Sequence, residues 1–446
     1  MIILYMKKKE LKHLKFDSLV DYFSQFCKEM PDLRLNPKYL MQEVTMSAFA
    51  MFMFKDQSML KFQEELQEEE RRNNLSQLFH IENIPKENQI RNVLDTVSPE
   101  IFERIFNEYF RRLQRGKHIE KYRVLDGHYT LALDATQYFT SDKIKCKHCL
   151  TKTDKEGKKR YYHSILQGAL ITPNLKIVLP FPPEEIRNED GTKKQDCELN
   201  AAKRLIPKIR KAHPKLKFLV NVDGLYGNNP FLNLLEENRM NFISVVKKGS
   251  QKFLFEWIQA NDENKLNSTH EIIETKKFKK SIITEKHQYK WCNNVPLNGI
   301  MKKDINYFEY TFINKKGKKG FHSTWITNLE ITEENIEELV KVARSRWKIE
   351  NENFNILKNH GYHLEHNFGH GKENLSMVLF TLNLLAFFTH EIQRLTNKNV
   401  IEFFENNARY KFWELFTFLF RFMVFKDFEQ LIEFVTGKRK FMLVPV

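Results

Sequence analysis

Two aspartates follow apolar runs of the kind that form buried strands. Asp134 ends the run Tyr129–Asp134, and Asp223 comes directly after Phe218–Val222. Ligands of α/β sheets collect at the carboxyl ends of the strands, and burying a carboxylate is costly unless it meets a cation. Two such acids on neighbouring strands form the oxygen site that Mg²⁺ or Mn²⁺ prefers. The pair predicts a divalent-metal site, although either aspartate alone would equally suit a turn, as Asp126-Gly127 does.

A third acid, Glu350, lies in a stretch with helical character, four residues after Arg346. Residues four apart share a helix face, and one carboxylate beside one guanidinium suits a metal ion and a bound phosphate. A plain surface salt bridge would use the same pair of residues. Glu352 falls on roughly the opposite side of the helix, at about 100° per residue. Glu350 is therefore the preferred third ligand.

Strands and helices in the middle of the chain must position these acids. The mixture predicts an α/β fold, with strands at 129–134, 162–171, 175–179, 218–222 and 242–246 and a helix at 199–212. Residues 250–328 contain many short runs rich in Thr, Ile, Tyr and Phe and predict a β-rich segment. Thr332 is expected to cap the long helix that leads to Glu350.

Both ends of the chain, 1–118 and 372–446, are expected to be helical. Ser98-Pro99-Glu100 is typical of a helix start. Apolar residues then recur at four-residue steps on one face, at Ile101, Ile105, Tyr109 and Leu113. A shorter helix is predicted at 89–95. Two short helices joined by a tight turn form either a DNA-reading element or ordinary helical packing, and both alternatives stay open.

The charge balance favours an anionic partner. The 446 residues include 72 Lys and Arg against 57 Asp and Glu, which leaves a formal charge of +15 and favours nucleic acid. The segment 143–160 carries eight of the basic residues against two acids, and it would either follow a DNA backbone or form a solvated loop. The most apolar later stretch, Met377–Thr389, is too short to span a bilayer. We therefore expect a soluble, cytoplasmic protein without a membrane partner.

The five cysteines are too few and too scattered for a disulfide framework. Cys146 and Cys149 form a lone C-x-x-C, whereas structural zinc normally needs four ligands. Cys197 and His163 would complete a zinc set, but nothing in the sequence brings them close, so the zinc-free alternative is preferred. A second His-rich stretch contains His360, His363, His366 and His370. Its glycines favour a loop beside the catalytic helix, with some of these histidines meeting phosphate, over a second zinc site.

Taken in order, three motifs resemble the DD-E core of insertion-sequence transposases, in particular the cut-and-paste branch with a Y-R-E-K signature near the last acid. The motifs are Leu133-Asp134-Ala135-Thr136-Gln137-Tyr138-Phe139, Asn221-Val222-Asp223-Gly224 and Arg346-Trp347-Lys348-Ile349-Glu350. A His- and Gly-rich stretch from Asn359 to Gly371 also looks typical of that branch. The resemblance covers about residues 85–395 and is specific as an ordered set, although each piece alone would be weak.

The resemblance implies a ribonuclease H-like catalytic core that the β-rich insertion interrupts between the second and third acids. Together with the predicted elements, it divides the chain into a DNA-binding helical region (1–118), the first part of the core (119–249), the insertion (250–328), the catalytic helix (329–371) and a helical C-terminal region (372–446). It also implies that Asp134, Asp223 and Glu350 hold two Mg²⁺ or Mn²⁺ ions. Arg346, Lys348 and Lys358 would then bind DNA phosphates.

Two positions depart from the signature. Ala343 stands where the signature has Tyr, and Leu357 stands where it has Lys. Lys358 comes one residue later, and in an ideal helix its direction differs from that of Glu350 by about 80°. A one-residue bulge within 351–353 would restore its direction, since such bulges recur at functional sites. Unbroken α-helical bonding from 346 to 358 would exclude this idea.

Two metal ions about 4 Å apart activate a water, orient the phosphate and stabilise the leaving oxygen. The same site then accepts a DNA 3′-hydroxyl as nucleophile. The expected function is a DNA transposase that cleaves terminal inverted repeats and transfers them into target DNA. We expect a homodimer on double-stranded DNA, because two transposon ends must meet, and a nucleoid-associated setting in a prokaryotic cytoplasm. The alternatives are a ribonuclease H-like nuclease without strand transfer and an inactive DNA-binding relic.

Overall fold

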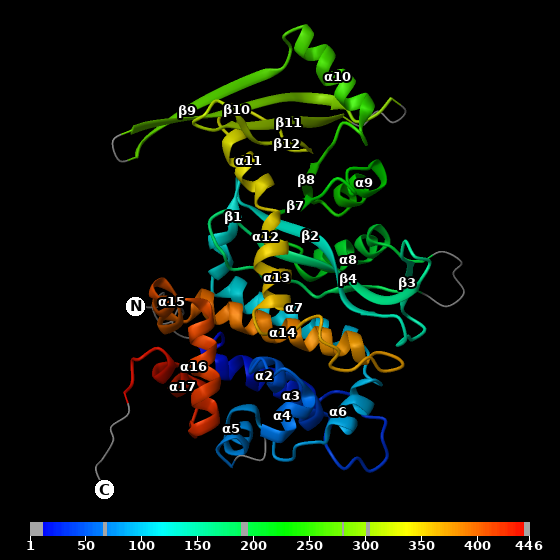
Figure 1. Ribbon diagram of the computed structural model, residues 1–446, viewed down its shortest axis with the longest axis vertical. Helices are drawn as coiled ribbons and strands as arrows, with labels where there is room; N and C mark the ends of the chain where they lie inside the picture. The colour runs from blue at the N-terminus through cyan, green and yellow to red at the C-terminus, as the bar shows by residue number, and fades with distance from the viewer. Residues whose placement is uncertain (1–11, 66–68, 189–194, 279–280, 300–303, 441–446) are drawn as a thin grey trace.

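The computed structural model describes residues 12–65, 69–188, 195–278, 281–299 and 304–440. In this part of the chain one twelve-stranded mixed sheet runs from the centre of the molecule to one end (Figure 1). The strands are β1 (Arg123–Val124), β2 (His128–Ser141), β3 (Leu150–Thr153), β4 (Lys159–Ile171), β5 (Leu179–Pro180), β6 (Glu184–Ile186), β7 (Phe218–Val222), β8 (Asn241–Val245), β9 (Ser268–Phe278), β10 (Ser281–Pro296), β11 (Asp304–Ile313) and β12 (Lys319–Thr327).

The sheet has a parallel centre. Its strand order is β3-β4-β2-β7-β8-β12-β11-β10-β9, with β1 paired to β2, and with β5 and β6 paired to β4. Strands β2, β7 and β8 are parallel, whereas β4 is antiparallel to β2. Every residue of β7 is buried, as expected for a parallel strand that is covered on both faces. This mixed α/β arrangement is compatible with a ribonuclease H-like core.

The segment 250–328 extends the same sheet. It begins with a helix, α10 (Lys252–Glu263), which the β-rich expectation missed. Four antiparallel strands follow, and β12 joins them to the core by pairing with β8. Figure 1 shows these strands and α10 at the top of the molecule. A second apolar core links them to helix α11 (Ile336–Arg344) through Phe308, Tyr310, Trp325, Leu339 and Val340. The added strands therefore support the helix that leads to Glu350.

Helices at both ends of the chain pack together below the sheet (Figure 1). Phe16 stacks on Phe428 with ring centroids 4.5 Å apart. The remaining helices are α2 (Phe16–Lys28), α3 (Met41–Met53), α4 (Met59–Glu65), α5 (Glu69–Phe79), α6 (Glu87–Leu94), α7 (Glu103–Arg115), α8 (Glu198–Ala212), α9 (Asn229–Glu237), α12 (Trp347–Ile349), α13 (Asn355–Asn359), α14 (Leu375–Thr396), α15 (Lys398–Asn406), α16 (Arg409–Phe422) and α17 (Phe428–Val435), with 3-10 turns at Pro99–Phe102 and His118–Tyr122 and a π-helical turn at Glu350–Phe354.

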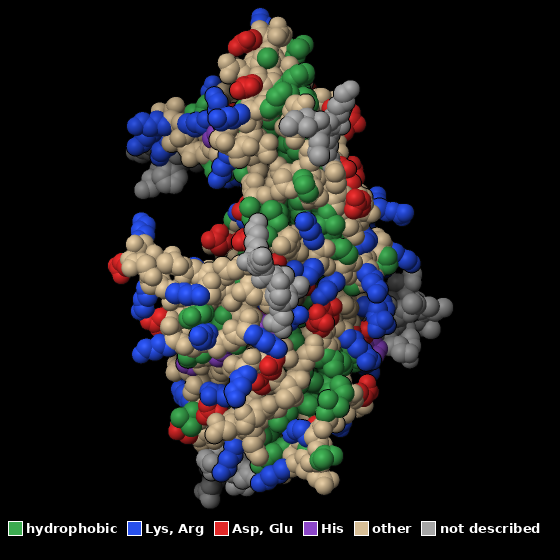
Figure 2. Space-filling view, turned by 90° about the vertical axis from the view of Figure 1, so that its right-hand side faces the viewer, with side chains coloured by type: hydrophobic (Ala, Val, Ile, Leu, Met, Phe, Trp, Pro, Cys, Tyr) green, Lys and Arg blue, Asp and Glu red, His purple; other side chains and the backbone are tan. Residues whose placement is uncertain are grey.

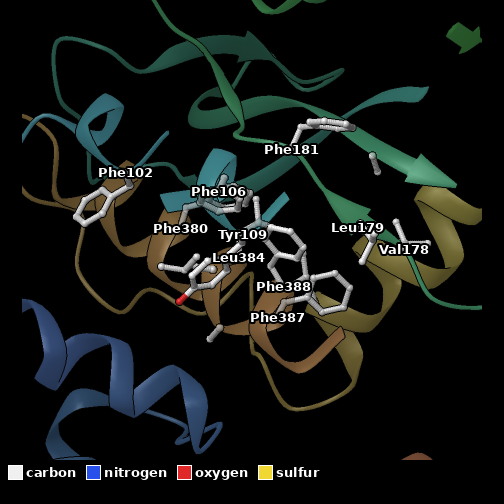
Figure 3. Close-up of a cluster of buried hydrophobic side chains, with 14 of the residues drawn as sticks. Phe102, Phe106, Tyr109, Val178, Leu179, Phe181, Phe380, Leu384, Phe387 and Phe388 are labelled. Carbon is white, nitrogen blue, oxygen red and sulfur yellow. The ribbon is translucent and has the colours of Figure 1, made fainter. Parts of the chain in front are cut away.

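Helix α14 is the central core helix. By length and composition its 22 residues would suffice to cross a membrane, but 94% of its most apolar window is buried inside the protein. The helix is longer than the apolar stretch Met377–Thr389, which alone is too short to span a bilayer, because it continues beyond that stretch at both ends. Figure 3 shows its aromatic side chains against those of α7. The Phe388 ring lies 5.8 Å from Phe106 and 5.1 Å from Phe110, centroid to centroid. This packing favours the structural alternative for α7 over a DNA-reading one.

Two local expectations were wrong. Helix α11 starts at Ile336 with Asn335 as its N-cap residue, not at Thr332. Thr332 comes just before the turn 333–335 that leads into the helix, and its carbonyl accepts from Ile336 N–H at 3.1 Å. The predicted strand at 175–179 is reduced to β5, which begins at Leu179. The backbone before it forms a turn whose carbonyls face the side chain of Lys348 instead of a neighbouring strand.

Candidate active site

The register of the parallel strands brings Asp134 and Asp223 side by side. The last paired residues of β2 and β7 are Ala132 and Asn221. Both aspartates come two positions later, so they continue the same register and lie on the same face of the sheet. The expectation that Asp134 ends its strand was wrong, because β2 continues to Ser141 against β4. What ends near Asp134 is the parallel pairing with β7, and this opens the sheet at the two carboxylates.

The two aspartates are held by nearby backbone. Asp134 Oδ1 accepts a hydrogen bond from Ala135 N–H at 3.1 Å. Asp223 Oδ1 accepts from Leu225 N–H at 2.9 Å, which starts the turn after β7. Ser244 Oγ, on the neighbouring strand β8, donates to the Asp223 carbonyl at 3.1 Å. These contacts fix the main chain at both aspartates.

A buried asparagine ties the helix that carries Glu350 to the sheet. Asn221 Nδ2 donates to the carbonyls of Val342 at 2.8 Å and Ala343 at 3.2 Å. These carbonyls belong to the last turn of α11, where they also accept from the N–H groups of Ser345 and Arg346 in the turn that follows. Helix α11 ends at Arg344, and the chain turns through Ser345 and Arg346 into α12. The Asn221 contact therefore sets where the helix breaks and where Glu350 begins the next turn.

The charges show that the three acids share one site. Burial raises the pKa of Asp134, and the negative charges of Asp223 and Glu350 raise it further. The Arg346 guanidinium opposes this rise, with Nη1 3.7 Å from Asp134 Oδ2. A half-buried carboxylate beside two further negative charges is stabilised by a cation. This all-oxygen set fits Mg²⁺ or Mn²⁺.

A fourth acid at this site was not predicted from the sequence. Glu198 is the first residue of α8, and Tyr226 Oη donates to its Oε2 at 3.5 Å. Burial raises the pKa of Glu198, and the charges of Asp223 and Asp134 raise it further. In the sequence Glu198 looks like an ordinary acid in the first turn of a helix, where the helix dipole favours it. Only the packing of α8 against the sheet reveals its neighbours.

The three cations predicted to bind phosphate have different surroundings. Arg346 lies at the carboxylates, as described above. Lys348 is buried, and its ammonium donates to the carbonyls of Thr172, Pro173 and Leu175 at 2.7, 2.8 and 2.7 Å. An ammonium has three donors, so none is left for a phosphate. The assignment of Lys348 to DNA binding was wrong, and its role is to fix the turn before β5.

The predicted bulge is present in the helix that carries Glu350. A π-helical turn covers Glu350–Phe354 and includes the three residues expected to hold it. One extra residue in a turn offsets about 100° of rotation. Lys358 therefore takes nearly the angle that an unbroken helix would give Leu357, which is itself fully buried. The Lys358 ammonium forms an ion pair with Glu365 at 2.9 Å, and its side chain is 28% exposed.

The predicted zinc set is partly wrong. Cys146, Cys149 and His163 lie together, but their fourth neighbour is His370. Cys197 is exposed at the start of α8. The other three histidines of the stretch 360–370 are not members of this cluster. The C-x-x-C pair and the His-rich stretch are each visible in the sequence, but no local signal joins them.

Residues 128–388 match the sequence model of the transposase DDE domain family, over more than half of the chain. The matched segment includes both aspartates, Glu350 and the strands that hold them. This chain belongs to the transposase DDE domain family. No curated protein matches it.

Membership fixes the general activity. The protein is a DNA transposase, and the family implies polynucleotidyl transfer with DNA as the partner. Transposases of this family generally use divalent metal ions, which agrees with the oxygen donors described above. The face of the transposase in Figure 2 carries more Lys and Arg than Asp and Glu, as a DNA-acting protein of formal charge +15 requires.

Proposed function

We propose that this transposase cleaves DNA at the terminal inverted repeats of its own element and joins the freed ends to target DNA. Asp134, Asp223 and Glu350 are the proposed catalytic residues. The observation that carries the proposal is their convergence, in which the shared strand register aligns the two aspartates and both other acids raise the pKa of Asp134. The architecture also fits the cut-and-paste branch, because strands β9–β12 lie between the second and third acids.

The proposed cofactor is a pair of Mg²⁺ or Mn²⁺ ions held by the three acids, with Glu198 at the edge of the site. Such ions supply an activated oxygen nucleophile and charge stabilisation for an in-line displacement at phosphorus. The protein's own residues do the rest. The sheet holds two carboxylates in fixed positions, and Asn221 holds the helix that brings the third. Preorganised charge of this kind is the main contribution of a protein to phosphoryl transfer.

Arg346 and Lys358 are the proposed phosphate ligands. Arg346 Nη1 lies 3.7 Å from Asp134 Oδ2. A metal cation at the carboxylates would weaken the attraction between Arg346 and Asp134, and this would leave the guanidinium available for a phosphate oxygen. Lys358 lies about three turns farther along and would hold the same strand. Glu365 pairs with it at the surface, and a DNA phosphate readily replaces such a partner because surface ion pairs contribute little.

DNA is expected to engage more of the chain than the acids. The basic segment 143–160 follows β2 and includes β3, which pairs with β4, the neighbour of the strand that carries Asp134. We propose that it follows the backbone of the bound end. The helical region 1–118 is proposed to contribute further DNA contacts, and two protomers are proposed to pair the two ends. The proposed setting is the nucleoid of a prokaryotic cytoplasm.

A strand-transfer assay separates this proposal from a nuclease without joining activity. The substrate is a pre-cleaved duplex that carries the inverted repeat flanking the gene and ends in a 3′-hydroxyl, incubated with supercoiled plasmid and Mg²⁺. We expect joined products, and none when the 3′ end is a dideoxynucleotide. Nicking of intact repeat DNA without any joined product would instead support the nuclease alternative.

A further inference from the structure

Four metal-ligating side chains converge at the edge of the catalytic sheet. Cys146 and Cys149 come from the loop between β2 and β3, His163 comes from β4, and His370 comes from the segment between α13 and α14. Their ligand atoms all lie within 4.8 Å of one another. Cys149, His163 and His370 are buried, and Cys146 is half-buried. Sulfur and imidazole nitrogen are the donors that structural zinc prefers.

Five of the six distances between these atoms are those of a tetrahedron around zinc. With Zn–S near 2.3 Å and Zn–N near 2.0–2.1 Å, ideal edges are about 3.8 Å for S–S, 3.5 Å for S–N and 3.3 Å for N–N. The two Sγ atoms are 3.7 Å apart, and the two Nε2 atoms are 3.2 Å apart. His163 Nε2 lies 3.4 Å from Cys146 Sγ and 3.5 Å from Cys149 Sγ, and His370 Nε2 lies 3.5 Å from Cys149 Sγ.

Both histidines are oriented to present a lone pair. His163 Nδ1 faces Glu185 Oε1 at 3.4 Å, and His370 Nδ1 faces the Gly371 carbonyl at 2.9 Å. These oxygens only accept, so they favour the tautomer with the proton on Nδ1, in which each Nε2 of a neutral ring is an acceptor. Two acceptor nitrogens 3.2 Å apart repel each other unless a cation lies between them. Histidine ligands of zinc are commonly held in this way, by a carboxylate or a carbonyl at the other nitrogen.

We propose that Cys146, Cys149, His163 and His370 bind one structural zinc ion. Two sulfur and two nitrogen ligands complete the tetrahedron, so the site offers no position for a substrate or a water and is not catalytic. Aromatic side chains cover it, since the Phe139 ring lies 4.6 Å from the His370 ring and 5.8 Å from the His163 ring, centroid to centroid.

The bound zinc would join two halves of the active site that are far apart in the sequence. Phe139 lies on β2, the strand that carries Asp134, and His370 follows the helix that carries Glu350. Lys147, between the two cysteines, makes a parallel link through its ion pair with Glu373 at 2.8 Å. The zinc would thus fix both the basic segment 143–160 and the loop after the catalytic helix. This proposal does not depend on the proposed function.

Metal content tests the proposal directly. The full-length protein is purified without chelators or a histidine tag and analysed by elemental mass spectrometry. We expect one zinc per chain in wild type and a large loss in His370→Ala and in Cys146→Ser. Cys197→Ser is the matched control and should retain one zinc, because Cys197 lies outside the cluster. Cobalt-substituted wild type should show the strong visible absorption of tetrahedral thiolate coordination, and this absorption should be lost in the same two variants.

Stability gives a readout that does not depend on the yield of the variants. Removing zinc from wild type with a zinc-selective chelator, with Mg²⁺ in excess, should lower the Tm by several degrees, and added Zn²⁺ should restore it. Folded wild type that contains no zinc and binds none at micromolar concentration would overturn the proposal. Zinc retained at full occupancy in both His370→Ala and Cys146→Ser would overturn it as well.

Discussion

Lys348, on the helix that carries Glu350, can be tested for a structural role against a DNA-binding role. The residue is 5% exposed, and its ammonium donates to three backbone carbonyls. Lys348→Met keeps most of the stem and removes all three donors. The buried Thr172 carbonyl then loses its partner at a cost of about 1–3 kcal/mol, and the carbonyls of Pro173 and Leu175, which water reaches more easily, cost about 0.5–1 kcal/mol each. We expect the unfolding free energy to fall by about 3 kcal/mol.

Thermal unfolding and DNA titration measure the two roles separately. With about 2.1 cal/mol/K of unfolding entropy per residue over the whole chain, a loss of 3 kcal/mol lowers the Tm by about 3 °C. Binding of repeat DNA per folded molecule, followed by fluorescence anisotropy at fixed salt, should be unchanged. Lys358→Met is the matched control on the same helix, and it should keep its Tm but bind DNA more weakly and with a smaller salt dependence. A Lys348→Met protein with normal Tm and weakened DNA binding would refute the reasoning.

Three further predictions concern the elements that hold the acids. The surroundings of Asp134 raise its pKa, so its ionisation costs stability at pH values above the raised pKa and costs none at pH values below the ordinary aspartate pKa. Asp134→Asn should therefore raise the Tm at neutral pH, and this gain should vanish toward acid pH. A Tm difference between variant and wild type that stays the same from neutral to acid pH would contradict the prediction. Asn221→Leu removes two hydrogen bonds to helix carbonyls, which keep Ser345 N–H and Arg346 N–H as donors, and should cost about 1–2 kcal/mol in urea unfolding, together with a lower cleavage rate; normal stability and rate would show that the contact does not position Glu350. Deleting Asn351 should turn the π turn into α-helix and rotate Lys358 by about 100°, with circular dichroism preserved and DNA affinity reduced to that of Lys358→Met; wild-type affinity would contradict the role of the bulge.

The sequence predicted the parts of the site that depend on local pattern. Apolar strands before Asp134 and Asp223, and the four-residue spacing of Arg346 and Glu350, are visible in a single stretch of chain. The π turn was also predictable, because Lys358 is displaced by one residue from the position that the family resemblance requires. These features depend on neighbours within about two helical turns.

Contacts between distant segments were not predictable in the same way. Lys348 looks like a basic residue near a phosphate until its three carbonyl partners, more than 170 residues earlier, are known. Glu198 looks like a first-turn helix acid until α8 is packed against the sheet. His370 lies 221 residues from Cys149, and only the return of the chain after α13 brings them together. In each case the side chain's role is set by tertiary register, which local spacing does not determine.

The most direct measurement compares Mg²⁺-dependent cleavage of a duplex carrying the flanking inverted repeat by wild type, Asp223→Asn and Asp126→Asn. Asp126 is the control because it lies in a turn with a positive φ of 51°, which asparagine also adopts. We predict cleavage by wild type and Asp126→Asn, and a loss of at least two orders of magnitude in Asp223→Asn with its fold and DNA affinity retained. Equal cleavage by wild type and Asp223→Asn would contradict the assignment of the active site.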